Sequence, residues 1–324
     1  MNNFKSLRHW LKTGDDNLKM YKKGSRGIYC TKDITEGEII MKIPPKYIIE
    51  LSKIDNKISE KLYNKNSYIA TYLFIKANQS HSFWDTYLDS MPKDLSEYVY
   101  FYDKEKLKLL KNTSMMCGGT YNFNLHMKNI ISDSKIIYKW LISKNLLPSK
   151  YKNYSDFFPI FLKYRILVCS RIFAYNKNNK EELGLVPYAD LLNHSDKPNT
   201  HWYFNDEMNA FVVVATKDIK KNKEIYDSYG NKTNFELMLY YGFSIKNNPY
   251  STLNFMVGNV LFEADHDSRL KELYSYDVSH DDIKNKLKAI LKDHENKMKK
   301  NNITDNNIIN IYNDEINIIK KLLS

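Results

Sequence analysis

The apolar residues along this chain change their spacing, and the changes divide it into three regions. Near the N-terminus, and again between residues 200 and 228, they form short runs bounded by Gly, Asn and Asp, a pattern typical of strands. Between about residues 51 and 161 they recur every three or four positions, as on amphipathic helices, and this spacing returns from about Gly258. We therefore predict an α+β domain over residues 1–257, with a helical insertion at about 51–161, and a short helical C-terminal domain over 258–324.

The first predicted elements are a helix and a hairpin. Apolar residues at helical spacing in residues 4–11 precede Thr13-Gly14, which is a helix stop signal. A turn at residues 24–27, to which we attribute both of its glycines, leads into the short strand 28–30. After a second turn the apolar strand 39–41 follows, so we predict that these two strands pair as a β-hairpin.

One short motif occurs twice. Thr31-Lys32-Asp33-Ile34 recurs at residues 216–219, and each copy is followed within a few residues by a Glu-Ile pair. The recurrence predicts two similar strand–turn–strand units, and two copies are too few for a long repeat array.

Helix and strand signals then alternate towards the C-terminal region. Within the insertion, Trp84 and Pro92 bound a short predicted helix. A later helix would be capped by Ser155 or Asp156, with Pro159 tolerated in its first turn, and would run towards residues 170–173. The predicted strands after it are residues 200–204, 210–215 and 224–228.

Two amphipathic helices are predicted near the C-terminus, joined by a polar loop at about residues 301–307. The apolar residues of their two faces are Ile283, Leu287, Ile290, Leu291 and Met298, and Ile308, Ile311, Tyr312, Ile316 and Ile319. These faces exceed what two short helices can bury on each other. We therefore expect them either to dock a protein partner or to pack on the core of the domain that precedes them.

Charge and cysteine usage narrow the classes of partner. The formal charge of +11 suggests nucleic acid, but basic residues alternate with acidic ones and form no compact Arg-rich block, so we expect no nucleic-acid partner. Cys30, Cys117 and Cys169 lack the paired spacing of a zinc site and are too sparse for a disulfide scaffold. We see neither a signal peptide nor a run of about 20 apolar residues. We expect a soluble, monomeric, cytoplasmic or nuclear protein without a membrane partner.

Two segments carry the candidate chemistry. The first, GLVPYADLLNHSDKPNT, spans residues 184–200 and has Asn193-His194 at its centre. A metal site there would need further ligands near His194, and a nucleophilic Ser195 would need a Gly-x-Ser-x-Gly elbow that is absent. The second segment, EIYDSYGNKTNFELMLYYGF, spans residues 224–243 and places Tyr229 before a Gly-Asn turn. Alone, an Asn-His pair is more often structural, but the matching residues that precede and follow it in order along the chain favour a functional site.

Together these segments resemble the signature of SET-domain protein methyltransferases, in the branch of the Rubisco large-subunit lysine methyltransferase and the actin-histidine methyltransferase. The resemblance extends over about residues 16–250. It implies a SET-domain β-fold of small sheets, whose last two signature segments form a knot-like crossing. That crossing would build a pocket for S-adenosylmethionine and a narrow channel for the target side chain.

The resemblance also implies roles for individual residues, and no metal among them. Tyr229 matches the catalytic tyrosine and would also contact the substrate. The residues implied to bind S-adenosylmethionine are Gly24, Ser25, Arg26, Arg171, Asn193, His194, Tyr241 and Phe243. Those implied to line the substrate site beside Tyr229 are Ser170, Phe173 and Asp190. The helical C-terminal domain would then be a possible docking region for the substrate.

The chemistry of methyl transfer fits these residue types. Displacement at a sulfonium methyl group demands positioning and electrostatics from the enzyme. The target amine must arrive neutral, which for a free lysine costs about 4 kcal/mol at neutral pH, and a desolvated aromatic channel lowers the pKa of that amine. Phe173, two residues after Arg171, favours lysine because phenylalanine offers an imidazole no hydrogen-bond partner. The predicted function is S-adenosylmethionine-dependent protein-lysine N-methyltransferase. The alternatives are a protein-histidine N-methyltransferase of the same fold and a non-catalytic, SET-like protein-binding module.

Overall fold

The chain folds into two compact units, which are described separately. The computed structural model describes residues 2–12, 18–23, 25–54, 61–117, 122–300 and 303–324. Unit 1 comprises Met1–Lys93 and Ile130–Gly230, and unit 2 comprises Asp94–Asn129 and Asn231–Ser324. The bounds of these units differ from those of the expected domains, 1–257 and 258–324, which stay a prediction.

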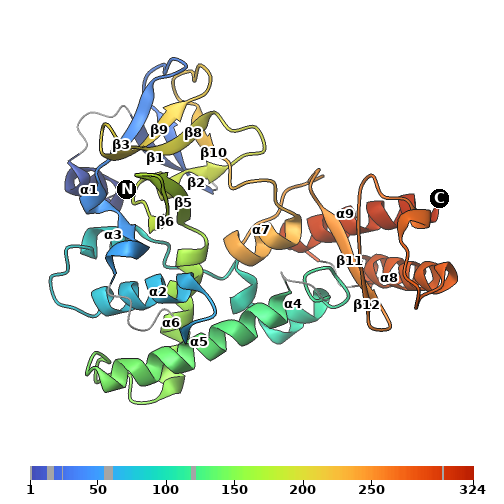
Figure 1. Ribbon diagram of the computed structural model, residues 1–324. Coiled ribbons are helices and arrows are strands. Elements are labelled where there is room, and N and C mark those ends of the chain that lie inside the picture. The colour runs from blue at the N-terminus through green and yellow to red at the C-terminus, as the bar shows by residue number, and fades with distance from the viewer. Residues whose placement is uncertain (1, 13–17, 24, 55–60, 118–121, 301–302) are drawn as a thin grey trace. The chain divides into compact units, whose positions relative to one another are not determined.

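The described strands of unit 1 form three small sheets (Figure 1). The first has the strand order β1 (Leu18–Lys23), β2 (Ser25–Cys30), β10 (Glu224–Asp227), β7 (Asn193–His194). The second has the order β3 (Ile39–Ile43), β9 (Ala210–Ala215), β8 (Thr200–Asn205), and the third the order β4 (Ile49–Glu50), β6 (Lys180–Leu185), β5 (Ile172–Lys177). All pairs are antiparallel except β10 with β7, which is parallel. The strands predicted at residues 200–204, 210–215 and 224–228 are confirmed, whereas β5 and β6 were not predicted.

The predicted hairpin between residues 28–30 and 39–41 is wrong. Both segments are strands, but β2 pairs with β1 and β10, and β3 pairs with β9. The reason is the repeated motif. Each copy connects two strands, as predicted (β2 to β3, and β9 to β10), and each strand pairs with a strand of the other copy instead of its own.

The two copies of the motif lie against each other through matching backbone hydrogen bonds. Ile34 and Ile219 exchange both of theirs, at 2.9 and 2.8 Å. Two more bonds recur at equivalent positions in the two copies. Cys30 N–H donates to the Lys223 carbonyl, as Ala215 N–H does to the Glu38 carbonyl. Asn222 N–H donates to the Cys30 carbonyl, as Gly37 N–H does to the Ala215 carbonyl. The equivalent Gly37 and Asn222 both have positive φ, 81° and 66°, which these two residue types tolerate best.

The side chains of the motif repeat the same exchange. Asp33 accepts from the backbone N–H of Lys221 at 2.8 Å, and the equivalent Asp218 accepts from the backbone N–H of Glu36 at 3.0 Å. Each aspartate thus satisfies a turn amide of the other copy. This explains why the same residue type stands at both positions.

Helices account for most of the predicted insertion. The helices of unit 1 are α1 (Asn2–Leu11), α2 (Lys65–Ala77), α3 (Asp85–Ser90) and α6 (Tyr154–Cys169), and α5 (Phe123–Ser143) contributes residues to both units. The short helix expected between Trp84 and Pro92 is confirmed as α3. The predicted start of α6 is wrong: Asn153 is its N-cap, Asp156 accepts from the Asn153 backbone N–H at 3.1 Å, and Pro159 lies inside the helix beyond its first turn.

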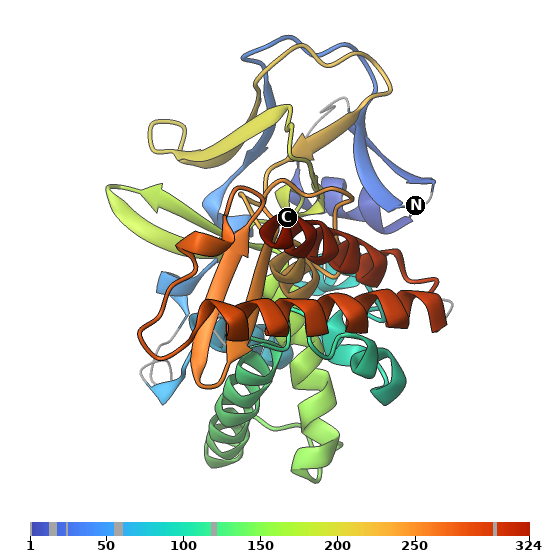
Figure 2. The ribbon, with the colours of Figure 1, turned by 90° about the vertical axis from the view of Figure 1, so that its right-hand side faces the viewer.

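Unit 2 is built around a hairpin that the sequence analysis did not predict. Its helices are α4 (Lys104–Leu109), α7 (Asn234–Tyr241), α8 (His280–Lys300) and α9 (Asn306–Leu323), and its strands are β11 (Thr252–Val257) and β12 (Val260–Asp265). The expected domain boundary at Gly258 falls in the turn of this hairpin. Figures 1 and 2 show α8 and α9 side by side, next to the two strands.

The hairpin covers the apolar helix faces. Phe255 and Phe262 stack at 5.5 Å within one buried cluster that also takes Leu287 of α8 and Ile319 of α9. The faces do exceed what the two helices bury on each other, but the hairpin covers the surplus. Docking of a protein by this region stays a prediction without that support. In the described part of the chain, no helix is long and apolar enough to cross a membrane.

Candidate active site

The segment Asn193-His194 forms a two-residue strand, β7, which pairs in parallel with the end of β10. Asn193 lies opposite Tyr226 and His194 opposite Asp227. The backbone N–H of Ser195 extends the pairing by donating to the Asp227 carbonyl at 2.8 Å. This pairing brings the two signature segments of the sequence together within unit 1, and it directs the chain after β10 towards His194.

The side-chain amide of Asn193 joins three strands. Its Nδ2 donates to the backbone carbonyl of Arg26 and to Oε1 of Glu224, both at 2.7 Å. The other oxygen of Glu224 accepts from the hydroxyls of Tyr29 and Tyr226, both at 2.8 Å. Because these bonds use the amide protons of Asn193 inside the protein, the residue has a structural role alongside the implied contact with a cofactor.

Gly27 is required by packing and not by a turn. It lies inside strand β2, and a Cβ built on it would meet Oε1 of Glu224 at 2.2 Å and Nδ2 of Asn193 at 3.2 Å. Although Glu224 is flexible in principle, the bonds to Asn193 and the two tyrosines hold its carboxylate. The attribution of this glycine to turn geometry is therefore wrong.

His194 and Tyr229 are in direct contact. The backbone N–H of Tyr229 donates to Nδ1 of His194 at 3.0 Å, and the two ring centroids lie 5.2 Å apart. The hydroxyl of Tyr229 donates to the backbone carbonyl of Leu192 at 2.7 Å. The hydroxyl that matches the catalytic tyrosine is thus fixed beside the Asn193-His194 strand. Because Nδ1 accepts, its lone pair is unprotonated in this arrangement.

A cluster of charged groups surrounds Asp190. Nη1 of Arg171 donates to the Asp190 carbonyl at 2.7 Å and lies 3.4 Å from its Oδ2. The Tyr87 hydroxyl donates to the same Oδ2 at 2.7 Å, and the Asp190 side chain is fully buried. Burial and the neighbouring Arg171 lower the pKa of Arg26, while Asp190 opposes that shift. Burial, followed by the charge of Asp190, raises the pKa of Tyr87 well above its usual value, so this phenol stays protonated and donates.

An aromatic wall adjoins the end of β10. Phe173 contacts Trp202 edge to face with centroids 5.1 Å apart, and Trp202 stacks on Phe211 at 5.5 Å. The indole N–H of Trp202 donates to Asp227 at 3.0 Å. Phe173 is buried and lies on strand β5, so the expectation that it continues the preceding helix is wrong. Its place at the wall of a substrate channel stays a prediction.

The remaining predicted residues lie on several different elements. Ser170 is the C-cap of α6, and its hydroxyl donates to the Leu167 carbonyl at 3.2 Å. Ser25 begins strand β2, while Gly24 lies outside the described residues. Tyr241 and Phe243 belong to unit 2, where they flank the αL residue Gly242 at the end of α7 and their ring centroids lie 6.3 Å apart.

Three residues of this site were missed by the sequence analysis, namely Tyr87, Trp202 and Glu224. Tyr87 lies in the helical insertion, more than a hundred positions from Asp190. Glu224 could have been suspected, because it opens the second signature segment next to aromatic residues. For Tyr87 and Trp202 no local pattern distinguishes them from other buried aromatic residues in this tyrosine-rich chain.

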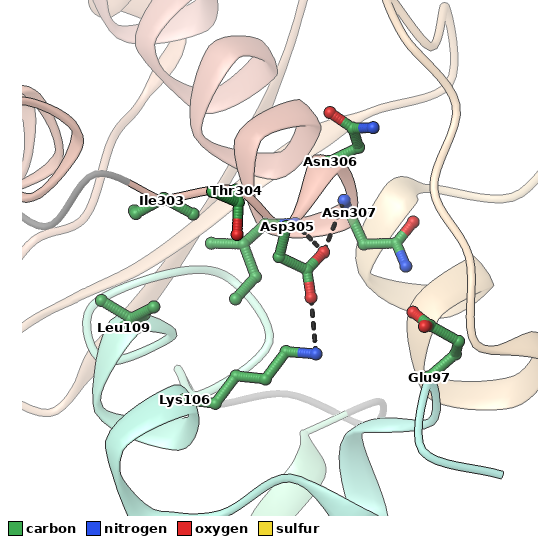
Figure 3. Close-up of a pocket in the computed structure, with 9 residues that line it drawn as sticks. Glu97, Lys106, Leu109, Ile303, Thr304, Asp305, Asn306 and Asn307 are labelled. Carbon is green, nitrogen blue, oxygen red and sulfur yellow. Dashed lines mark hydrogen bonds and ion pairs between the residues drawn. The ribbon is translucent and has the colours of Figure 1, made fainter.

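Other candidate sites are weaker. Unit 2 has a cavity of about 700 Å³ beside the start of α9, where Lys106 and Asp305 form an ion pair at 2.6 Å (Figure 3). Asp305 already caps α9 by accepting from the backbone N–H of Asn307 at 2.8 Å, so the helix N-terminus is satisfied from within. Within the described ranges, no group of three or more His, Cys, Asp and Glu side chains could hold a metal ion.

Comparisons with known proteins show related sequences and a similar fold. The chain is 25% identical over 255 residues to actin-histidine N-methyltransferases of Mus musculus and Homo sapiens, which covers 74% of this chain and 41% of each relative. It thus spans less than half the length of these relatives. Its fold is similar to that of Rubisco LSMT bound to AdoMet, with a TM-score of 0.70, 18% identity, and coverage of 99% of this chain and 90% of that chain. The SET domain of LSMT bound to lysine and AdoHcy gives a TM-score of 0.69 at 16% identity, with the same coverage. The family model for the SET domain matches residues 25–230, which is more than half of the chain, and the chain therefore belongs to the SET domain family.

Proposed function

We propose that this protein is an S-adenosylmethionine-dependent protein-lysine N-methyltransferase. The observation that carries the proposal is the fixed Tyr229 hydroxyl, which bonds to the Leu192 carbonyl at 2.7 Å beside the Asn193-His194 strand. Membership of the SET family and the AdoMet-bound structures of similar fold support the choice of cofactor. S-adenosylmethionine would supply an electrophilic methyl group on a sulfonium.

The residues present fit such a cofactor. Arg26, Arg171 and Asp190 together carry a net positive charge in a largely buried cluster. A partly buried positive cluster of this kind favours a carboxylate, because a charge-assisted bond to guanidinium offsets its desolvation. Arg171 would hold the carboxylate of the cofactor's amino-acid end, and the backbone of Asn193 and His194 would hold the nucleoside side, as the resemblance implies.

Tyr229 would orient the target nitrogen. Its hydroxyl hydrogen is directed to Leu192, and a phenol oxygen remains an acceptor when it donates. An amine N–H pointing at that oxygen places the nitrogen lone pair in a defined direction, which is the main contribution an enzyme makes to a displacement reaction. The aromatic surroundings would lower the pKa of the amine and so raise its neutral fraction.

Lysine is favoured over histidine by the wall around Phe173. The indole N–H of Trp202, whose ring contacts Phe173, already donates to Asp227 at 3.0 Å. An imidazole held there would bury one nitrogen without a partner, at a cost of about 1–3 kcal/mol. The methylenes of a lysine have no such cost.

Histidine is the second candidate, because the named relatives are actin-histidine N-methyltransferases. Mass-spectrometric mapping of methylation in cell extract incubated with isotope-labelled S-adenosylmethionine separates the two. Methyllysine as the main product supports the proposal, methylhistidine replaces it with the second candidate, and no transfer with retained cofactor binding favours a non-catalytic module.

Variants of Phe173 sharpen the test. Phe173→Asn adds an amide that can pair with an imidazole, so we expect lysine turnover to fall about tenfold or more while cofactor affinity changes little. Phe173→Leu is the matched control, because it keeps the wall apolar and should keep lysine as the target. Equal lysine turnover in both variants would mean that Phe173 does not select the target side chain.

A further inference from the structure

Helix α3 contacts the charged cluster of the candidate site at two points. The Tyr87 hydroxyl donates to Oδ2 of Asp190 at 2.7 Å, and the carbonyl of Ser90 accepts from Nη2 of Arg26 at 2.7 Å. The Ser90 hydroxyl in turn donates to the Tyr87 carbonyl at 2.7 Å, which ties the two contacts together. One turn of a six-residue helix thus reaches both the carboxylate and an arginine of the cluster.

We propose that Tyr87 is a positioning residue for recognition of the cofactor carboxylate: its hydroxyl fixes Asp190, and Asp190 fixes the guanidinium of Arg171. The proposal rests on the proposed function and assigns a role to the insertion helix that carries Tyr87. Tyr87 itself would not touch the cofactor.

The geometry of Asp190 supports this role. Its Oδ1 has no hydrogen-bond partner among the described residues, so the orientation of the carboxylate depends on Oδ2. Tyr87 is the hydroxyl donor to that oxygen, and Arg171 lies 3.4 Å from it. The Asp190 carbonyl also accepts from Nη1 of Arg171, so backbone and side chain of one residue hold one guanidinium nitrogen. Loss of the Tyr87 hydroxyl would let the carboxylate turn towards Arg171 and would change the position of that guanidinium.

The negative charge of Asp190 gives its hydrogen bond with Tyr87 a second effect. Without a second donor, the Asp190 carboxylate would pair more fully with Arg171 and would compete with a ligand carboxylate for it. A hydrogen bond to an ionised group is about twice as strong as a neutral one, so the phenol takes up part of the negative charge. Arg171 is then less strongly engaged by Asp190 than it would be without the phenol.

Two ligands separate positioning from packing. S-adenosylhomocysteine has the amino-acid end, and 5′-methylthioadenosine lacks it. In Tyr87→Phe the affinity for S-adenosylhomocysteine should fall about tenfold, in keeping with the loss of one bond to a charged group, while that for methylthioadenosine should stay within about twofold. Titration calorimetry measures both.

Three further variants complete the test. Tyr154→Phe is the matched control, because this half-buried tyrosine of unit 1 bonds to Ser134 at 2.6 Å and should change neither affinity. In an Arg171→Met background, Tyr87→Phe should add nothing, since the two residues act in series. Asp190→Glu keeps the charge but shifts the carboxylate, and it should also weaken only S-adenosylhomocysteine. Asp190→Glu serves as the test if Tyr87→Phe does not fold.

The outcomes distinguish the two proposals. If the wild-type protein binds S-adenosylhomocysteine and Tyr87→Phe weakens both ligands equally or neither, Tyr87 is a packing residue and the inference is wrong, while the proposed function stands. If the wild type binds both ligands equally well, Arg171 does not read the carboxylate and the inference is again wrong. If the wild type binds neither ligand, the proposed function fails and the inference fails with it.

Discussion

At the scale of single residues, the clearest prediction concerns the hydroxyl of Tyr229. Tyr229→Phe removes the bond to the Leu192 carbonyl, which should cost about 0.5–1.5 kcal/mol of folding free energy. If the hydroxyl orients the target nitrogen, kcat should fall about 10²–10³-fold with cofactor affinity almost unchanged. Steady-state kinetics and calorimetry on one preparation measure both quantities.

The exposed Tyr203 supplies the control for that variant. Tyr203→Phe removes a hydroxyl from the surface and should leave kcat and stability unchanged. Turnover by Tyr229→Phe at the level of Tyr203→Phe would reduce Tyr229 to a structural role.

Asp227 should make stability depend on pH. Burial raises the pKa of its carboxyl from 3.8 to about 6, against the bonds from Ser228 and Trp202 that lower it. The folded state therefore holds the proton more tightly than the unfolded chain, and this contribution to stability declines as pH rises from about 4 to about 6. The decline is at most about 3 kcal/mol. Asp227→Asn should lack it, so the unfolding free energy of the wild type minus that of the variant should fall over that window and be constant above it. Parallel urea titrations from pH 4 to 8 check this, and superimposable pH profiles would contradict it.

The residues of the site differ in how far the sequence could predict them. Asn193, His194 and Tyr229 lie in ordered segments, and one parallel strand pairing brings those segments together. The bond from Tyr87 to Asp190 joins positions 103 apart, and the clash of a Cβ at Gly27 with Glu224 depends on a pairing between β2 and β10. Such contacts follow from which strands are neighbours, which local spacing does not encode.

At the scale of elements, periodicity predicted helices better than strands. The helices of the insertion and of the C-terminus were expected, because their apolar stripes are long. Strands β5 and β6 were missed although Phe173 and Tyr175 alternate with exposed residues and Asn178-Asn179, both at positive φ, form a turn suited to a hairpin. Six residues following a helix gave too short a pattern to override the helical signal before them.

The hairpin β11–β12 makes the C-terminal helices part of a shared core. Deleting residues 281–324 would expose Phe255, Phe262 and their apolar neighbours, so we expect an insoluble product in place of a soluble protein with a raised KM. A milder variant, Phe255→Ala, should destabilise unit 2 by about 3–5 kcal/mol. Leu261→Ala is its control, since Leu261 lies on the same hairpin but is exposed and should cost less than about 0.5 kcal/mol. Denaturant titration measures these variants, and a soluble deletion variant would mean that the helices are dispensable for folding.

At the scale of the whole molecule, we expect ligand binding to be independent of metal. S-adenosylmethionine at about 100 times its Kd should stabilise the protein by about 2.7 kcal/mol. The shift in Tm should be the same with and without a chelator, because within the described ranges no three metal-ligating side chains cluster. Differential scanning calorimetry with and without EDTA tests this, and a shift abolished by EDTA would require a metal site.

The family could be predicted from the sequence, whereas the pairing of the two motif copies with each other was not predicted. The order of Arg171, Asp190, Asn193-His194 and Tyr229 along the chain carried the resemblance, and the SET family model confirms it. The overall charge of +11 contributed little to predicting the function, since no compact basic region accompanies it. The target side chain depends on a few channel contacts, and a change at one of them would be enough to alter it.

The exchange between the two motif copies has a consequence for synthesis on the ribosome. Ile34 and Ile219 are 185 positions apart, so at about 5–20 residues per second the first copy emerges about 10–40 s before its partner exists. During that interval the amides of Ile34 and Gly37 lack their native acceptors. Strand β3 then lacks its partner β9, and β2, paired with β1 on one side, has its other edge open to association with other nascent chains. The segment between the copies can nevertheless change in length at little thermodynamic cost, because doubling a closed loop adds only about 0.6 kcal/mol of entropy. Lengthening the helical insertion would therefore mainly extend the waiting time and leave the final stability almost unchanged.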